Sequence, residues 1–417
     1  MLVNQYDMLI CISNAVDLIS RDYTSHHQQV AFLSYHIGRE MGLDDMTCRN
    51  LMMAGMLHDI GALSNEERLM LVEEEPLTVN GHAFRSAKLL EEAAPFVSIA
   101  DIVRFHHIRW ANGAGQRFQH SQVPIGSHIL YLADRVCVKF NTRESAIEQI
   151  PHVLKSIVAH SGSLFMPEAV EALEKLRNRD HIWLELLEHS PLDYLPTQRI
   201  FAMMSLNIND ILDVTRMMSF IIDFRSHFTA THSAGVAAIA QKLGELSGFS
   251  EVECKMLLIA GYLHDLGKLT VPNSVLEKPA ALNHEEFNII RGHTFHTYRL
   301  LNIIDGFEII NKWASYHHEK LNGKGYPFRL SEENIPLGSR IMAVADIFTS
   351  ITEDRPYRSG MSQPQIMSIL KTMSEQKAIC KKVVDRLISH IDEFIELCHE
   401  SQKREAAIYE NFFSISA

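Results

Sequence analysis

Apolar residues along most of the chain recur at the spacing of an α-helix, and the two-residue alternation of a strand is nearly absent. One helical face of residues 251–263 carries Val252, Met256, Leu257, Ala260 and Leu263. Residues 168–176 show the same periodicity, and Pro167 just before them is a helix-start signal. Glycine and proline concentrate in few loops, chiefly residues 322–327. The sequence therefore predicts an all-α protein.

The same series of motifs occurs twice along the chain. LMMAGMLHDIGAL (51–63) matches LLIAGYLHDLGKL (257–269), and GHAFRSAKLL (81–90) matches GHTFHTYRLL (292–301). FHHIRWANGAG (105–115) matches YHHEKLNGKGYP (316–327), and PIGSHILYLADRV (124–136) matches PLGSRIMAVADIF (336–348). Because order and approximate spacing persist, we interpret the chain as two tandem helical-bundle domains. We expect them at residues 1–185 and 205–417, with a helical connector between them.

Composition and charge exclude several classes of protein. The chain has 417 residues and a formal net charge of -12, which argues against a general DNA or RNA binder, because such a protein needs a basic face. The six cysteines form no CxxC pair, so neither a zinc ribbon nor a disulfide framework is indicated. No apolar run approaches the roughly 18 residues of a membrane span. We expect a cytoplasmic protein that does not insert into membranes.

Histidine is the exception to this ordinary composition, with 23 residues, many beside another histidine or an aspartate. In the second copy the candidate metal ligands are His232, His264, Asp265, His293, His317, His318 and Asp346. Imidazoles and carboxylates without thiolates suit iron, manganese, nickel or zinc. Asp265 is the natural bridge of a dinuclear centre, which leaves about four protein ligands for each metal and open positions for water and substrate.

The first copy keeps the same seven residue types, namely His26, His58, Asp59, His82, His106, His107 and Asp134. Other features differ: Ala62 stands where the second copy has Lys268, and Ile108 stands where it has Glu319. Gly115-Gln116-Arg117 replaces Gly325-Tyr326-Pro327. We expect a degenerate domain that regulates, senses a ligand or dimerises, with homodimer formation as one consequence. A second active site and metal binding by this copy remain open.

The second copy resembles the HD-GYP domain, a subgroup of the HD phosphohydrolases, over roughly residues 218–397. The resemblance rests on HDLGK (264–268), HHEKLNGKGYP (317–327) and ADIFTSITEDRPYR (345–358). It implies a helical bundle with metals held between helices. It also implies hydrolysis of the bacterial second messenger cyclic di-GMP, or of 3',3'-cyclic GMP-AMP in some members.

The resemblance also implies roles for individual residues. His232, His264, Asp265 and Asp346 would hold one metal, and Asp265 would reach a second metal with His293, His317 and His318. Lys268 would face the scissile phosphate, while Gly325, Tyr326 and Pro327 would form the loop that shapes the site. Arg355 and Arg358 match basic positions that contact the dinucleotide. A glutamate that binds a third metal in some members is Phe228 here, so we expect two metals, iron or manganese.

The expected reaction is an in-line attack of metal-activated water on phosphorus, with Asp265 and Lys268 as catalytic residues. Cyclic di-GMP would give linear pGpG, and a second cut would give GMP. Asn322 replaces the aspartate common before the glycine of the loop, and asparagine keeps the turn. Three alternatives remain: selectivity for 3',3'-cyclic GMP-AMP, a non-catalytic effector that binds the nucleotide or a diguanylate cyclase, and hydrolysis of another nucleotide. The Gly-Tyr-Pro loop argues against the last.

Overall fold

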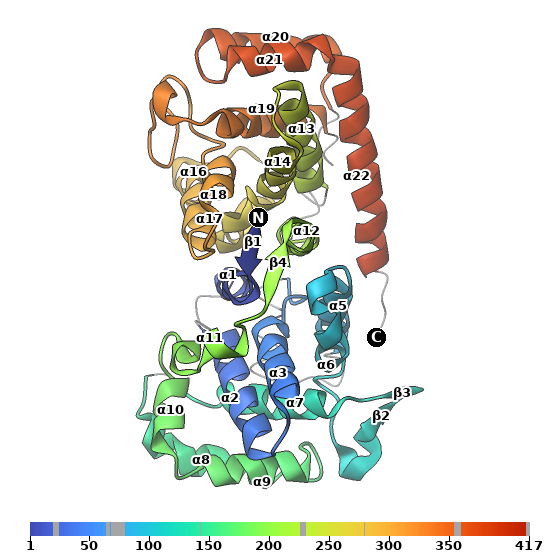
Figure 1. Ribbon diagram of the computed structural model, residues 1–417, viewed down its shortest axis with the longest axis vertical. Helices are drawn as coiled ribbons and strands as arrows, with labels where there is room; N and C mark the ends of the chain where they lie inside the picture. Colours follow the sequence, from blue (N-terminus) through green and yellow to red (C-terminus); the bar gives the residue numbers. More distant parts are fainter. Residues whose placement is uncertain are drawn as a thin grey trace. The chain divides into compact units, whose positions relative to one another are not determined.

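The computed structural model describes residues 1–19, 25–63, 67, 80–141, 143–225, 231–278, 280–353 and 360–413 (Figure 1). The chain divides into two compact units. The N-terminal unit is residues 4–205, and the C-terminal unit is the chain from Leu206 on together with Met1–Val3. Both units are built of helices, so the predicted all-α fold is confirmed; the strands among the described residues are short (Figure 1).

The N-terminal unit consists mainly of helices, which follow one another along the chain. They are α1 (Gln5–Asp17), α2 (His26–Glu40), α3 (Asp45–Leu57), α5 (Asn80–Glu91), η2 (Ala94–Ile99), α6 (Ala100–Arg104), η3 (Ala111–Gln116), α7 (Ile125–Cys137), α8 (Ala146–Val158), α9 (Pro167–Leu176), α10 (Asp180–Leu186), η4 (Pro191–Tyr194) and α11 (Thr197–Ile200). Strands β2 (Arg117–Phe118) and β3 (Ser121–Gln122) form an antiparallel hairpin. The expected connector region thus holds two short helical turns, η4 and α11.

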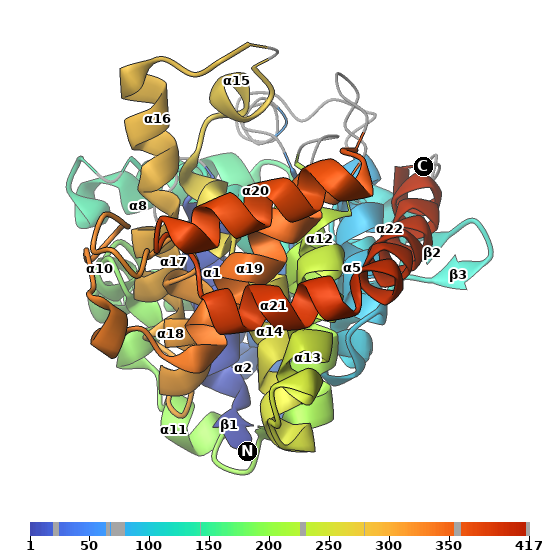
Figure 2. The ribbon, with the colours of Figure 1, turned by 90° about the horizontal axis from the view of Figure 1, so that it is seen from above.

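The C-terminal unit repeats this plan. Its helices are α12 (Ile208–Asp223), α13 (His232–Leu246), α14 (Glu251–Leu263), η5 (Leu266–Thr270), α15 (Asn273–Leu276), α16 (His284–Arg291), α17 (His293–Leu301), α18 (Glu308–Ser315), η6 (Glu332–Asn334), α19 (Leu337–Thr352), α20 (Gln363–Glu375), α21 (Lys381–Ser389) and α22 (Ile391–Phe413). Strand β1 (Leu2–Asn4) pairs with β4 (Ser205–Asn207). In Figure 2, α20 and α21 lie side by side over α19.

Local sequence signals explain where helices begin. The predicted helix at 251–263 is α14, and its first turn is closed by a capping box between Ser250 and Glu253. The helix predicted at 168–176 is α9, which begins one residue earlier with Pro167 at its first position. Both helix predictions are confirmed, because caps and apolar periodicity act locally and need no tertiary contact.

Each unit contains an unusually close crossing of two helices. A Cβ atom on Gly261 of α14 would lie 2.3 Å from the Cα of Ala237 on α13. The N-terminal unit repeats this contact, since a Cβ on Gly55 would lie 2.5 Å from the Cα of Ala31. The backbones can approach this closely only because glycine has no side chain. The crossing fixes the end of α14, where His264 and Asp265 follow.

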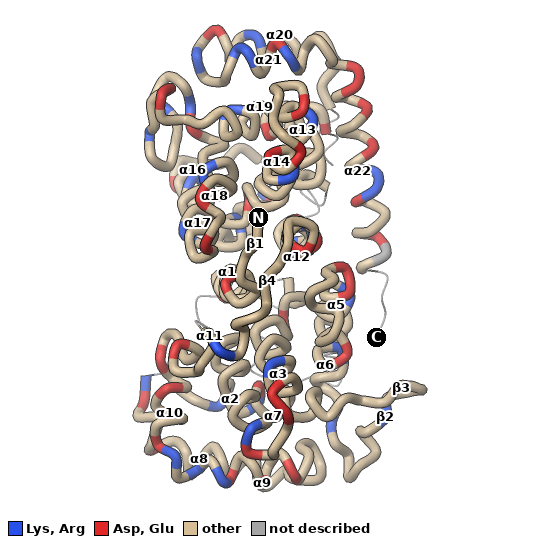
Figure 3. Tube along the Cα trace, viewed as in Figure 1, with Lys and Arg blue, Asp and Glu red and all other residues tan. Residues whose placement is uncertain are grey.

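The structure shows where the charged residues and the cysteines lie. Acidic and basic residues are interspersed over the helices of each unit (Figure 3). The six cysteines are buried and unpaired, as expected without a disulfide framework. Within the described ranges, we find no helix that is both long enough and apolar enough to span a membrane.

We predict that Gly261→Ala lowers the free energy of unfolding by about 1–3 kcal/mol, because the added methyl group overlaps the backbone of Ala237. Denaturant unfolding followed by circular dichroism measures the change. Val252→Ala is the control on the same helix, since Val252 is 49% exposed and its replacement should shift stability by only about 0.5 kcal/mol. Equal midpoints for the two variants would contradict a tight crossing.

Candidate metal centre

The seven predicted ligands of the second copy come from the ends and centres of helices in the C-terminal unit, and the fold brings them together. His232 begins α13, His264 and Asp265 follow α14, and His293 begins α17. The pair His317-His318 follows α18, and Asp346 lies within α19. Their ligand atoms form three overlapping groups, each with all atoms within 4.8 Å of one another: His232, His264 and Asp346; His264, Asp265 and His317; His293, His317 and His318.

Asp265 lies between the two outer groups. Its Oδ2 atom is 3.2 Å from His264 Nε2, and its Oδ1 atom is 3.3 Å from His293 Nε2. His293 Nε2 in turn lies 3.3 Å from His317 Nε2. One carboxylate thus faces a histidine of each outer group, which is the geometry that a bridging ligand requires.

The imidazole rings are oriented by their own helices. In His264, His293 and His317, Nδ1 lies 2.6–2.8 Å from the carbonyl oxygen three residues earlier, so Nδ1–H donates to that oxygen. This leaves each Nε2 as the lone-pair nitrogen. His264 Nε2 is buried and has no hydrogen-bond partner. A buried, unpartnered acceptor is costly, and a divalent cation would satisfy it.

The protonation states also suit a metal. Burial lowers the pKa of His293 to about 3 and that of His317 well below its usual value. Burial alone would raise the pKa of Asp265, but His264 and Lys268 hold it well below its usual range. Neutral imidazoles and an ionised carboxylate are the forms that bind metal. The described residues therefore fit a centre of divalent cations.

Glu353 is a further member of this site that the sequence reasoning missed. Its Oε2 atom lies 3.2 Å from His232 Nδ1, while His232 Nε2 lies 3.2 Å from Asp346 Oδ1. Burial opposes protonation of His232, yet these two carboxylates raise its pKa to about 10, so a metal at Nε2 would have to displace a proton. A carboxylate on the far nitrogen orients a histidine ligand and raises its basicity. The spacing of seven residues from Asp346 to Glu353, two helical turns, was the available signal.

Lys268 lies beside Asp265, as the sequence predicted. Its Nζ donates a hydrogen bond to Asp265 Oδ2 over 2.5 Å. Burial would lower the pKa of this amine, but Asp265 outweighs it and raises the pKa, so Lys268 is a cation. The buried side chain of Arg225 fixes the turn that carries Lys268, because its guanidinium donates to the carbonyl of Leu269 at 2.8 Å. The sequence reasoning also missed Arg225.

The Gly-Tyr-Pro loop packs against the paired histidines. A Cβ on Gly325 would lie 2.4 Å from the Cα of Glu319, so glycine is required here. The Tyr326 ring lies 5.0 Å from the His318 ring, and its backbone N–H donates to the His318 carbonyl over 3.3 Å. Asn322 Oδ1 accepts the backbone N–H of Lys324 at 3.1 Å, so the turn expected at Asn322 is present.

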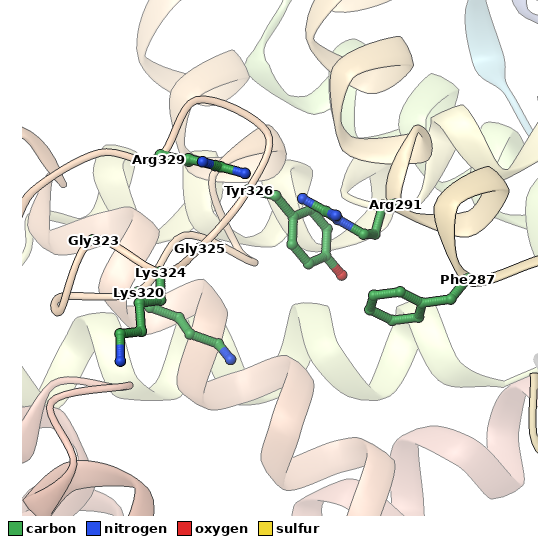
Figure 4. A pocket seen from close by; sticks show the side chains of 8 residues that line it. All are labelled: Phe287, Arg291, Lys320, Gly323, Lys324, Gly325, Tyr326 and Arg329. Carbon is green, nitrogen blue, oxygen red and sulfur yellow. The ribbon is translucent and has the colours of Figure 1, made fainter. Parts of the chain in front are cut away.

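A cavity of about 500 Å³ adjoins this loop (Figure 4). Two aromatic, four basic and two glycine residues line it: Phe287, Tyr326, Arg291, Lys320, Lys324, Arg329, Gly323 and Gly325. Through Tyr326 the cavity is next to His318 of the ligand cluster. The predicted positions Phe228, Arg355 and Arg358 lie outside the described residues.

The N-terminal unit assembles its own cluster of histidines and aspartates. The groups are His26, His58 and Asp59, and Asp59, His82, His106 and His107. Asp134 Oδ1 lies 3.2 Å from His26 Nε2, but its Oδ2 accepts a hydrogen bond from Arg135 over 2.7 Å. The buried Ala62 stands in place of the lysine. This cluster therefore has the ligand types without a cation for a substrate phosphate at that position.

Several known proteins resemble this chain in sequence or in backbone structure. A 3'3'-cGAMP-specific phosphodiesterase 1 of Vibrio cholerae serotype O1 is 29% identical over 409 residues, which cover 95% of this chain and 94% of the relative. A cyclic di-GMP phosphodiesterase of Thermotoga maritima is 30% identical over 228 residues, 54% of this chain and 57% of the relative. The crystal structure of a cyclic GMP-AMP specific phosphodiesterase of V. cholerae (V-cGAP3) has a TM-score of 0.65 at 22% identity, covering 94% of this chain and 98% of that one.

The backbone likeness to the crystal structure supports the fold described above. The family model described as HD domain matches residues 11–138 and again residues 216–379, one match in each half and together more than half of the chain. These two matches contain both clusters of histidines and aspartates. The chain therefore belongs to the HD domain family, whose model matches it in both halves.

Proposed function

We propose that the C-terminal unit is a metal-dependent phosphodiesterase that hydrolyses a cyclic dinucleotide. One observation carries the proposal: seven imidazole and carboxylate ligands converge beside Lys268, next to a cavity lined by four cations. Cations around a metal centre suit a substrate with more than one phosphate. The names of the relatives, all phosphodiesterases of cyclic dinucleotides, support this substrate class.

The ligand set supports two divalent metals, iron or manganese, and Asp265 would touch both. His232, His264 and Asp346 would complete one site, and His293, His317 and His318 the other. Bound divalent cations lower the pKa of water toward neutrality and offset charge on phosphate oxygens. Asp265 would hold the two metals close to each other. The imidazoles whose Nδ1–H groups donate to carbonyl oxygens would direct their Nε2 lone pairs at these metals.

Lys268 has a second part in this mechanism. Its ammonium is already held at the centre by Asp265, so it needs little reorganisation to donate a hydrogen bond to a phosphoryl oxygen. Tyr326 packs against one side of His318, whose side chain is still 30% exposed and so open to substrate. In the first copy, Ala62 and the guanidinium on Asp134 remove these conditions, which supports a regulatory role there.

Two cyclic dinucleotides are the leading candidate substrates. The sequence reasoning placed cyclic di-GMP first, and the Thermotoga relative bears that name over about half of this chain. The relatives that match 95% of the chain, at 29% and 26% identity, are both named as 3'3'-cGAMP-specific. The likeness across both units favours 3',3'-cyclic GMP-AMP. Cytoplasmic location, homodimer formation and contact with a diguanylate cyclase stay predictions.

We predict that His264→Ala/Asp265→Ala abolishes turnover of 3',3'-cyclic GMP-AMP and cyclic di-GMP, because one metal loses a ligand and the bridge is lost. Chromatography of products, with iron or manganese supplied, measures turnover and substrate preference together. The matched variant His58→Ala/Asp59→Ala changes the same motif in the first copy and should keep hydrolysis. Normal turnover by the first variant would disprove the site, and loss in both would overturn the division of roles.

Lys268→Met should lower kcat about 10²–10³-fold, the usual effect of removing one charge-stabilising donor, while metal content is retained. Elemental analysis of the purified variant and initial rates at saturating substrate test this. Lys242→Met on α13 serves as control, because Lys242 lies on the surface away from the ligand cluster. If kcat were unchanged, Lys268 would be only a structural partner of Asp265.

For Glu353→Gln we expect a 10–100-fold loss of metal affinity, because the carboxylate that orients His232 is replaced by a neutral amide. Metal titration of the stripped protein by calorimetry gives the affinity directly. Glu396→Gln, an exposed change on α22, controls for loss of a surface charge. Equal affinities in the two variants would show that His232 needs no such partner.

A further inference from the structure

The loop after the paired histidines has a left-handed residue at the matching position in both units. A backbone feature shared by both units reflects the fold, whereas a difference between them reflects the side chains. Arg329 has φ of 56° in the C-terminal unit, and the matching Gln119 has φ of 52°. In each unit a phenylalanine, Phe328 or Phe118, comes just before it. The left-handed conformation is uncommon outside glycine. The fold therefore sets this backbone, and the side chain placed there is the variable.

The two units hold this turn by different means. In the N-terminal unit the chain closes as the hairpin β2–β3, with Arg117 opposite Gln122 and Phe118 opposite Ser121. In the C-terminal unit the carboxylate of Glu319 accepts the backbone N–H groups of Phe328, Arg329 and Leu330 at 2.6, 3.0 and 2.9 Å. The N-terminal unit has Ile108 at that position. A single buried side chain, 4% exposed, thus holds three consecutive N–H groups of this loop, whose ends are joined by one antiparallel bridge between Asn322 and Ser331.

A basic cavity lies beside this loop. Arg291, Lys320, Lys324 and Arg329 line it (Figure 4), and its lining contains no carboxylate. Within the part of the chain that the structure describes, none of the four lies within 4.0 Å of a carboxylate oxygen, whereas Arg340 on α19 is paired with Glu332. The matching positions of the first copy are Asn80, Arg109, Ala114 and Gln119, of which one is basic. Unpaired cations around a hollow indicate a polyanionic ligand.

The position of the cavity identifies which part of a substrate it would meet. Tyr326 lines the cavity, and the centroid of its ring also lies 5.0 Å from that of the His318 ring. The Arg291 guanidinium lies over the Tyr326 ring at 5.1 Å, as Figure 4 shows. A phosphodiester at the metal centre would therefore continue past Tyr326 into the cavity. A ligand with one phosphate would leave the four cations unused.

We propose that this cavity binds the second, non-reacting phosphate of the cyclic dinucleotide, with Arg329 as a specificity-determining residue and Glu319 as the residue that positions it. The inference rests on the proposed function. Because the contact is remote from the reacting phosphorus, its loss should appear in KM more than in kcat. Three of the cations are exposed, so the contribution should fall as salt concentration rises.

Arg329→Asn tests the proposal, since asparagine tolerates the left-handed backbone and only the charge is removed. With the full-length protein we expect KM for the cyclic dinucleotide to rise about tenfold or more, with kcat changed less than about threefold. Hydrolysis of bis(p-nitrophenyl) phosphate, which has one phosphate, should be unchanged. Arg299→Asn, an exposed change on α17 outside the cavity, is the matched control and should leave KM unchanged.

Glu319→Gln should raise KM in the same way, because an amide offers one acceptor oxygen where the carboxylate offers two. Combined with Arg329→Asn it should add less than the sum of the two changes, since both act on one contact. Any of three results would overturn the inference: a wild-type KM for Arg329→Asn, an equal loss of activity on bis(p-nitrophenyl) phosphate, or full additivity of the two changes in the double variant. Each of these results would leave the proposed function standing. Wild-type protein that cleaves bis(p-nitrophenyl) phosphate and neither dinucleotide would overturn the proposed function itself.

Discussion

The buried carboxylate of Asp265 is the contact on which the C-terminal unit depends. It lies against His264 and Lys268, in the turn that follows α14, and against His293 at the start of α17. A lone carboxylate in the interior would be strongly unfavourable, and so would the unpartnered Nε2 of His264. Lys268 reduces the cost of the buried carboxylate, and bound cations would satisfy both groups. The close helix crossing at Gly261 and the guanidinium of Arg225 hold the segments on either side of Asp265 in place.

The two copies show how one backbone can support different chemistry. Both have the close helix crossing, the histidines anchored to carbonyl oxygens three residues earlier, and the left-handed turn after the paired histidines. They differ in single side chains at decisive points. Alanine replaces Lys268, isoleucine replaces Glu319, and Arg135 engages the aspartate that matches Asp346. The features needed to gather ligands are thus separable from those that handle a phosphate.

The cavity beside Tyr326 connects this comparison to substrate choice. Glu319 holds the loop beside it, because its carboxylate accepts the backbone N–H groups of Phe328, Arg329 and Leu330. The charge of the cavity depends on residues scattered over α16 and the loop, which approach one another only in the folded chain. Recognition of a second phosphate there would let binding far from the reacting atom distinguish a cyclic dinucleotide from simpler diesters.

The sequence by itself determined the helical class, and it predicted the repeat and the seven candidate ligands in each copy. These follow from local periodicity, caps and repeated motifs, which act over a few residues and need no knowledge of packing. Only the tertiary structure decided that Glu353 contacts Nδ1 of His232 and that Arg225 donates to the turn that carries Lys268. It also decided that Glu319 accepts backbone N–H groups of the loop beside the basic cavity. The reason is physical: each of these contacts joins segments separated along the chain or depends on a loop conformation, so the distances and directions exist only once the helices have packed.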